Sequence, residues 1–204
     1  MTIKQFNGTY FLNEDRILFR FNTQNQEEYR FWFTRRTTLF LLAASAHLHA
    51  KRLEQTHSPD AVKALNEFEK QAILDTVKSE NSPVQVYESG VNFPLGFDPI
   101  LVMDVTCSLT KNGEKIARIE DVKDGEIDEA LSVDFVLPGG ASLNLKLAGN
   151  TLQTMRVLLD QLRQQAGWGE AILQVSNTSD EGEGFQAQSS KNISIHWYLN
   201  LTSA

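Results

Sequence analysis

Three histidines close together in the sequence are the first residues that could bind a metal ion. His47 and His49 lie two positions apart, and His57 follows them. A zinc ion needs several nitrogen or sulfur ligands converging on it. In a helix, residues two positions apart point about 200° away from each other. His47 and His49 therefore cannot share an ion without unwinding, and we expect ordinary histidines and no metal site.

The single cysteine, Cys107, is the next residue that could do chemistry. A reactive cysteine needs a neighbour that stabilises its thiolate. Cys107 instead alternates in register with Met103 and Val105, as residues facing a packed layer do. The sequence also contains no G-x-S-x-G motif, and its glycine pairs lack the strand-to-helix context of phosphate-binding loops. We therefore find no catalytic motif, expect no cofactor, and favour a protein that is not an enzyme.

An acidic run across residues 120–129 has the composition of a calcium-binding loop. It lacks the D-x-D-x-D-G order and the terminal glutamate at the required distance. We interpret the run as a solvated connection between elements.

The remaining candidate is a set of arginines around one tryptophan. Its members are Arg20, Arg30, Trp32, Arg35 and Arg36. A hairpin with a three-residue loop places Arg20 opposite Arg30, where like charges repel unless a partner supplies negative charge. Arg35 and Arg36 fall at the predicted start of a helix, where basic residues are slightly unfavourable. An acidic counterpart is expected for this candidate binding surface.

Three counterparts are compatible with the sequence. Residues 1–82 hold 11 basic and 10 acidic residues, whereas residues 83–204 hold 8 and 16, so the acidic half of the same chain is one source of charge. A protein partner or a second copy is another, because Trp and Arg are typical anchor residues of interfaces. Single-stranded nucleic acid stacking on Trp32 is the third, although the acidic second half repels phosphates and argues against it.

The elements that position these residues follow from hydrophobic periodicity. Residues 16–22 and 28–33 alternate between apolar and polar side chains, which predicts a β-hairpin with an aromatic inner face. Thr34 is a suitable N-cap for a helix over residues 35–55. That helix is apolar around much of its circumference, so we expect a sheet and another helix to bury it.

A second helix is predicted to start at Ser58-Pro59, which supplies a serine cap and a proline at the first helical position. Its apolar stripe consists of Val62, Leu65, Phe68, Ala72, Ile73 and Val77. We expect the two helices to form an antiparallel pair. Farther on, Asn112-Gly113 between alternating runs at 100–110 and 115–122 predicts another hairpin.

The predicted β-β-α pattern occurs twice. Strands at 131–137 and 141–147, a three-residue loop at 138–140 and a helix at 151–165 match the first hairpin and helix at an offset of 114 residues. The sequence thus predicts a single α+β domain over residues 1–204. It has a mainly antiparallel sheet, about three helices and a possible pseudo-repeat of residues 16–55 in 130–166.

Composition sets the limits on function. Hydrophobic residues make up 41% of the 204 residues and charged residues 22%, as in globular proteins. The most apolar run is much shorter than the roughly 20 residues of a membrane span. One cysteine and a first segment unlike a signal peptide predict a cytoplasmic protein with no membrane association.

The leading hypothesis is a non-enzymatic interaction or assembly protein that forms a homodimer. The alternatives are a nucleic-acid-associated protein that uses the arginine and tryptophan surface, and a small-molecule binder or enzyme with a pocket near residues 90–99.

Overall fold

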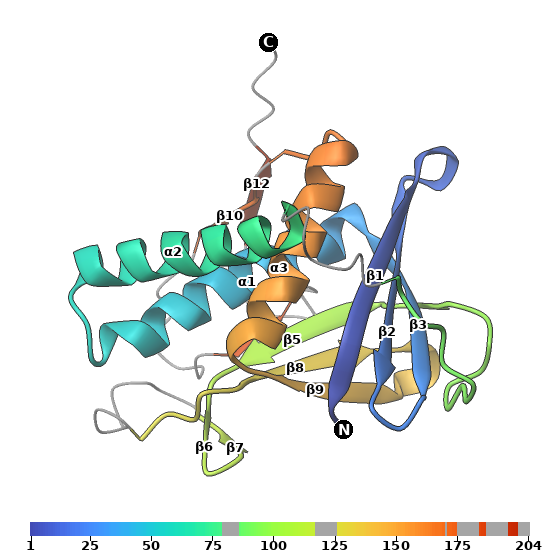
Figure 1. The fold of residues 1–204 in the computed structure, drawn as a ribbon, viewed down its shortest axis with the longest axis horizontal. Helices are drawn as coiled ribbons and strands as arrows, with labels where there is room; N and C mark the ends of the chain where they lie inside the picture. The colour runs from blue at the N-terminus through green and yellow to red at the C-terminus, as the bar shows by residue number, and fades with distance from the viewer. Residues whose placement is uncertain (79–85, 117–125, 170, 175–183, 187–195, 200–204) are drawn as a thin grey trace.

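The computed structural model describes residues 1–78, 86–116, 126–169, 171–174, 184–186 and 196–199. In this part of the chain, three helices pack among two four-stranded sheets and two smaller strand pairs, which confirms the α+β class (Figure 1). Two sheets replace the single sheet that the sequence pattern suggested.

The first sheet has the order β1-β2-β3-β4. Its strands are β1 (Ile3–Phe11), β2 (Arg16–Thr23), β3 (Glu28–Thr34) and β4 (Ile100–Leu101). The predicted hairpin forms in the expected register, with Leu18 opposite Trp32 and Arg20 opposite Arg30. The alternate residues of β2 and β3 are buried, which confirms an aromatic inner face: Ile17, Phe19, Phe21, Tyr29, Phe31 and Phe33. The N-terminal residues form a full edge strand against β2.

The second sheet has the order β11-β5-β8-β9. Its strands are β5 (Asp104–Ser108), β8 (Leu131–Val136), β9 (Ser142–Leu147) and β11 (Gly184–Gln186). β8 and β9 form the second predicted hairpin, whose inward residues Leu131, Val133 and Phe135 are buried. Two further strands, β10 (Ala171–Gln174) and β12 (His196–Leu199), pair with each other.

The predicted strand over residues 100–110 is wrong as one continuous element. β4 pairs in parallel with β3 in the first sheet, whereas β5 pairs with β8 in the second. Val102 and Met103 carry the chain between the sheets, so the alternating pattern crosses a change of sheet. β6 (Thr110–Lys111) and β7 (Glu114–Lys115) flank the Asn112-Gly113 turn. Both turn residues have positive φ, as an Asn-Gly hairpin requires.

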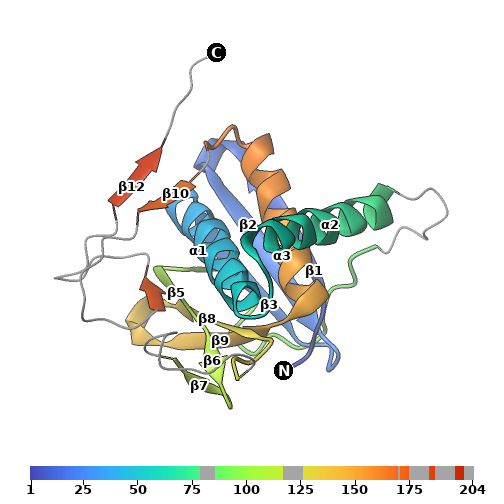
Figure 2. The ribbon, with the colours of Figure 1, turned by 90° about the vertical axis from the view of Figure 1, so that its left-hand side faces the viewer.

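Each of the two hairpins is followed by a helix that packs against the other sheet. α1 (Arg35–Glu54) follows β3 of the first sheet but packs against β5 of the second. α3 (Gly149–Gln165) follows β9 of the second sheet but packs against β1 of the first. The helices also contact each other, so one continuous core forms between the sheets (Figure 2). The prediction that α1 is buried on more than one side is confirmed.

α2 (Pro59–Lys78) begins as predicted, with the amide of Ala61 near the hydroxyl of Ser58. It folds back along α1 and also contacts α3 (Figures 1 and 2). Its predicted buried stripe is only partly correct, because Phe68 is 73% exposed while Val62 is buried. α2 lies at the edge of the helix layer, so its described apolar side chains beyond Val62 are partly buried or exposed.

The two hairpin-and-helix units share a loop length and an order of elements, but duplication itself stays a prediction. The predicted strand at 115–122 extends beyond residue 116 into residues that the structure does not describe.

Candidate functional site

The face of the first sheet that points away from the helices carries three of the five residues singled out in the sequence, Arg20, Arg30 and Trp32. The three helices lie on the opposite side of this sheet (Figures 1 and 2). We call this surface the outward face. By strand alternation it comprises Asn7, Thr9, Phe11, Arg16, Leu18, Arg20, Asn22, Glu28, Arg30 and Trp32.

The segment 86–97 covers one half of the outward face. Its anchor is Glu28, whose side chain is fully buried. The Glu28 carboxylate accepts a hydrogen bond from Arg30 Nε at 2.7 Å and another from the Gly90 amide at 2.7 Å. The Arg30 guanidinium lies against two rings that also contact each other, 4.0 Å from the centroid of Phe97 and 4.8 Å from that of Phe93. Arg30 and Glu28 therefore attach this segment to the sheet.

Arg20 belongs to the same covered half. It donates to Asn7 Oδ1 at 2.6 Å, and its guanidinium lies 5.0 Å from the centre of the Tyr87 ring. Burial raises the pKa of the Tyr87 hydroxyl, and the nearby Glu28 carboxylate raises it further. Neutral Tyr87 thus lies against Arg20 at all ordinary pH values. The opposed pair Arg20 and Arg30 is accommodated by Asn7, aromatic rings and one buried carboxylate.

The other half of the outward face is open at Trp32. This ring is partly exposed and packs edge-on against Phe11, with centroids 5.2 Å apart. The Arg16 guanidinium lies 4.3 Å above the same ring and pairs with Glu14. Leu101 pairs with Trp32 across the neighbouring strand. We call Phe11, Leu12, Arg16, Trp32, Arg36, Leu101 and Met103 the Trp32 patch.

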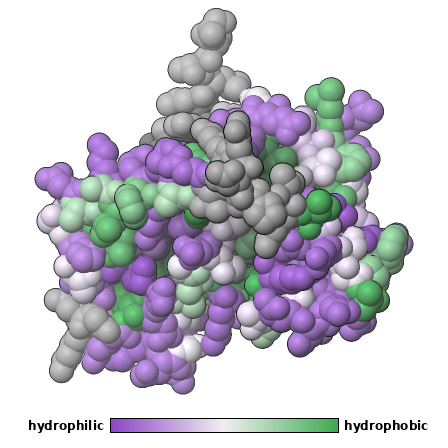
Figure 3. Space-filling view, in the orientation of Figure 1, coloured by the Kyte–Doolittle hydropathy of each residue, from purple (hydrophilic) through white to green (hydrophobic). Residues whose placement is uncertain are grey.

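Two exposed apolar side chains belong to the Trp32 patch, and a third lies on the covering segment. Leu12, Met103 and Phe97 are 77%, 44% and 64% exposed. Figure 3 shows hydrophobic side chains along the right-hand edge of the molecule, over the first sheet and the segment beside it. Arg36 Nη2 donates to the Met103 carbonyl at 3.2 Å, which holds an exposed cation within the patch. Aromatic rings and guanidinium groups thus alternate across one surface.

Arg35 lies apart from this surface, although it is the neighbour of Arg36. It is the first residue of α1, which Thr34 caps by accepting from the Thr37 amide. Its Nε and Nη2 atoms are buried without a hydrogen-bond partner among the described residues. The structure therefore brings Trp32 and Arg36 to the open half and Arg20 and Arg30 to the covered half, and it leaves Arg35 partly buried at the start of α1.

The residues near 90–99, where the sequence suggested a pocket, mostly form the covering segment. Gly90 lines a small hollow of about 160 Å³ with Lys4, Asn22 and Glu88 among its other lining residues. A larger cavity of about 310 Å³ lies elsewhere, between the three helices.

A polar cluster beside this larger cavity was missed at the level of sequence. His49 Nε2 lies 3.2 Å from Glu69 Oε2 and 3.1 Å from Gln153 Nε2, and Gln153 also donates to Glu69 at 2.5 Å. Arg156 Nη1 donates to Gln153 Oε1 at 2.9 Å. Each helix contributes to the cluster. Its only sequence signal was His49 within an apolar helix, because Gln153 comes from a distant segment.

The other expectations about chemistry concern metal ions and the cysteine. Among the described residues no group of three or more histidine, cysteine, aspartate or glutamate side chains could hold a metal ion. Cys107 is completely buried, as its alternation predicted, and burial raises the pKa of its thiol. A thiol in that state is a poor nucleophile.

No family model, curated protein or solved structure matches this chain. No described helix is long and apolar enough to cross a lipid bilayer.

Proposed function

We propose that the protein is a cytoplasmic, non-enzymatic assembly protein that binds a second copy of itself through the Trp32 patch. The carrying observation is the partly exposed Trp32 ring, packed by Phe11 and Arg16 on the open half of the outward face. Trp and Arg supply most of the binding energy in many interfaces, because each buries a large contact area. Ring packing within the patch also fixes Trp32 before binding, which lowers the entropic cost of association.

Charge supports a second copy as the occupant. The patch carries Arg16 and Arg36, whereas residues 83–204 have a net charge of −8. Exposed carboxylates of this acidic half include Glu114, Glu126 and Glu129. Another copy of the chain therefore offers both apolar area and a surface whose net charge is opposite to that of the two arginines. Such complementarity raises the association rate and selects the partner.

The test is the mass of the protein in solution. Sedimentation equilibrium or light scattering across a concentration series is expected to show a species larger than the monomer. Trp32→Ala should weaken the association by about tenfold or more, as truncation of an interface anchor does. Arg36→Glu should also weaken it, with an effect that shrinks at high salt.

Phe68→Ala is the matched control, because Phe68 is an exposed aromatic residue on α2 rather than on the outward face. It should leave the association unchanged. A strictly monomeric wild-type protein would contradict the proposal. An equal loss of self-association in the Phe68→Ala and Trp32→Ala variants would also contradict it.

A second candidate is single-stranded nucleic acid, which the same alternation of rings and guanidinium groups favours. Bases stack on exposed aromatic side chains, and arginines contact the backbone. Binding of a fluorescent oligonucleotide to monomeric protein, lost in both Trp32→Ala and Arg36→Glu and weakened by salt, would support this function. Absence of binding at low salt would exclude it.

A further inference from the structure

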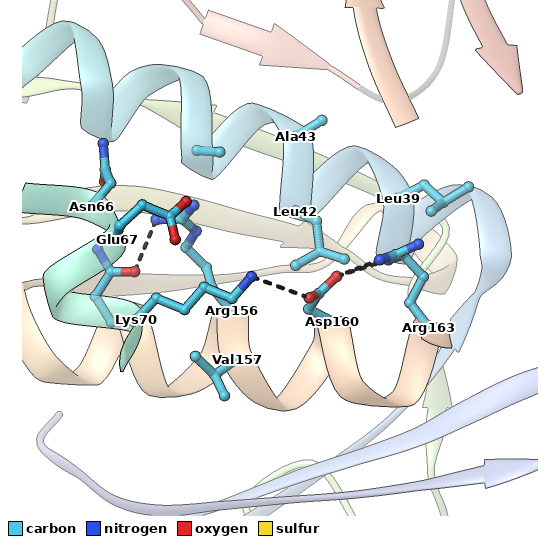
Figure 4. A pocket seen from close by; sticks show the side chains of 12 residues that line it. Leu39, Leu42, Ala43, Asn66, Glu67, Lys70, Arg156, Val157, Asp160 and Arg163 are labelled. Carbon is cyan, nitrogen blue, oxygen red and sulfur yellow. Dashed lines mark hydrogen bonds and ion pairs between the residues drawn. The ribbon is translucent and has the colours of Figure 1, made fainter. Parts of the chain in front are cut away.

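The cavity between the three helices has two chemically different walls. α1 supplies an aliphatic wall formed by Leu39, Leu42, Ala43 and Ala46. α2 and α3 supply the opposite, charged wall, which includes Lys70, Arg156, Asp160 and Arg163 (Figure 4). A volume of about 310 Å³ lies at the lower end of the range for small-molecule sites. The size and the two walls suit a small amphipathic molecule.

The charges of the cavity are not fully paired with one another. Asp160 is neutralised twice, by Arg163 at 2.8 Å and by Lys70 at 3.9 Å. Figure 4 shows Lys70 reaching along the cavity toward Asp160. Arg156 instead donates a hydrogen bond from Nη1 to the neutral amide oxygen of Gln153, and the carboxylates of Glu69 and Asp160 act on its charge through space.

Arg156 is a cationic residue of this cavity that has a buried donor atom without a partner among the described residues. Its side chain rises from α3 into the space between α1 and α2 (Figure 4). Its Nε atom is buried without a hydrogen-bond partner among the described residues. Burial lowers the pKa of this guanidinium, and the carboxylates of Glu69 and Asp160 offset that effect only in part. A buried donor left unpaired costs free energy, and an anion placed against it recovers that cost.

Asn66 defines a second requirement on the ligand. Its Oδ1 atom is buried without a partner among the described residues, on the α2 side of the cavity. This acceptor suits a hydroxyl or amine group close to the anionic head. The neighbouring Glu67 also lines this wall and is exposed to solvent.

From these contacts we infer that the three-helix cavity binds a small organic anion, a carboxylate or phosphate on a short aliphatic body. The anionic head lies against Arg156, and the aliphatic body lies against Leu42 and Ala46 on α1. This site is separate from the Trp32 patch, so either assignment can fail without the other.

Calorimetric titration with hexanoate, inorganic phosphate and hexylamine tests the inference on the full chain. Hexanoate should bind most tightly, phosphate more weakly because it lacks an aliphatic body, and hexylamine least because it is a cation. Arg156→Met should weaken hexanoate binding by about tenfold or more, as expected for a lost charged hydrogen bond. Lys63→Gln, an exposed residue on α2 outside the cavity, should leave binding unchanged.

A second variant keeps the test decisive if Arg156→Met does not fold. Ala46→Leu fills the aliphatic wall without altering any charge, and it should also weaken hexanoate binding. Far-UV circular dichroism and urea unfolding report whether each variant is folded. The inference is overturned if no probe binds saturably, if hexylamine binds as tightly as hexanoate, or if folded Ala46→Leu protein binds hexanoate like the wild type.

Discussion

At the scale of single residues, two ionisable side chains are buried where distant segments meet. Glu28 joins the first sheet to Gly90, and His49 joins α1 to Glu69 of α2 and Gln153 of α3. A buried polar group is tolerated only when its hydrogen bonds are satisfied. These two positions therefore couple local hydrogen bonding to the attachment of whole segments.

His49 should make the stability of the protein depend on pH. Burial lowers the pKa of His49, with Arg52 and Arg156 acting in the same direction and Glu69 opposing them. Burial also lowers the pKa of His47. The unfolded chain, with histidines near their ordinary pKa of about 6.5, thus binds more protons than the folded chain. The free energy of unfolding should fall as pH decreases below about 6.5.

Urea unfolding at a series of pH values between about 5 and 8 measures this dependence. His49→Gln removes one titrating group and should flatten the pH dependence, whereas His57→Gln, at the exposed turn between α1 and α2, should not. A wild-type unfolding midpoint that stays constant below pH 6.5 would contradict the inference that the folded chain holds His49 with a lowered pKa.

At the scale of elements, the two hairpin loops have the same length but different residues at their last position. Gln26 has φ of 58° and Gly140 has φ of 80°, so both positions adopt the left-handed conformation. Both residues are exposed, and nothing lies within 4 Å of a Cβ added at Gly140. The backbone conformation alone therefore decides which residue is suitable there.

Exchanging residue types at these two positions should have opposite effects. Gln26→Gly should raise the free energy of unfolding by roughly 0.5–1 kcal/mol, because glycine adopts a positive φ without steric cost. Gly140→Ala should lower it by about 1 kcal/mol for the converse reason. Chemical denaturation of both variants measures the two changes, and effects of the same sign would show that conformation is not the deciding factor.

The hairpins were the elements most completely predictable from the sequence, since alternation and loop length together set the register. The Leu18–Trp32 and Arg20–Arg30 pairs follow from that argument and are observed. Helix starts were predictable from Thr34 and Ser58, which are local signals. The division of residues 100–110 between two sheets was not, because each half of that run has its own partner strand.

The candidate site was predictable only in part, because contacts between distant segments leave no local signal in the sequence. Alternation placed Arg20, Arg30 and Trp32 on one face, but it could not show that the segment 86–97 covers the arginines and leaves Trp32 open. The cavity was invisible because its walls come from three helices that tertiary packing brings together. Phe68 shows the same limit, since helical periodicity alone does not reveal where the core ends.

At the scale of the whole molecule, the two halves are held together by exchanged helices. α1 packs on β5 and α3 packs on β1, so each sheet is covered by a helix that follows the other sheet. Neither half contains its own complete core. The chain should therefore unfold in a single cooperative transition, as small single domains do.

Fragments test this organisation directly. Residues 1–99 and residues 100–204, produced separately, should each lack cooperative unfolding and dispersed amide resonances. The intact chain should show both under the same conditions. A folded 1–99 fragment would show that the first sheet and α1 need no partner from the second half.

The exchanged helices also impose an order on biosynthesis. A ribosome releases the chain from its N-terminus, so α1 emerges before any strand of the sheet that will cover it has been made. Its leucine-rich surface then stays exposed until translation has passed β5 and β8. Nascent chains stalled in this interval should bind chaperones, and premature termination products should aggregate rather than accumulate as folded half-proteins.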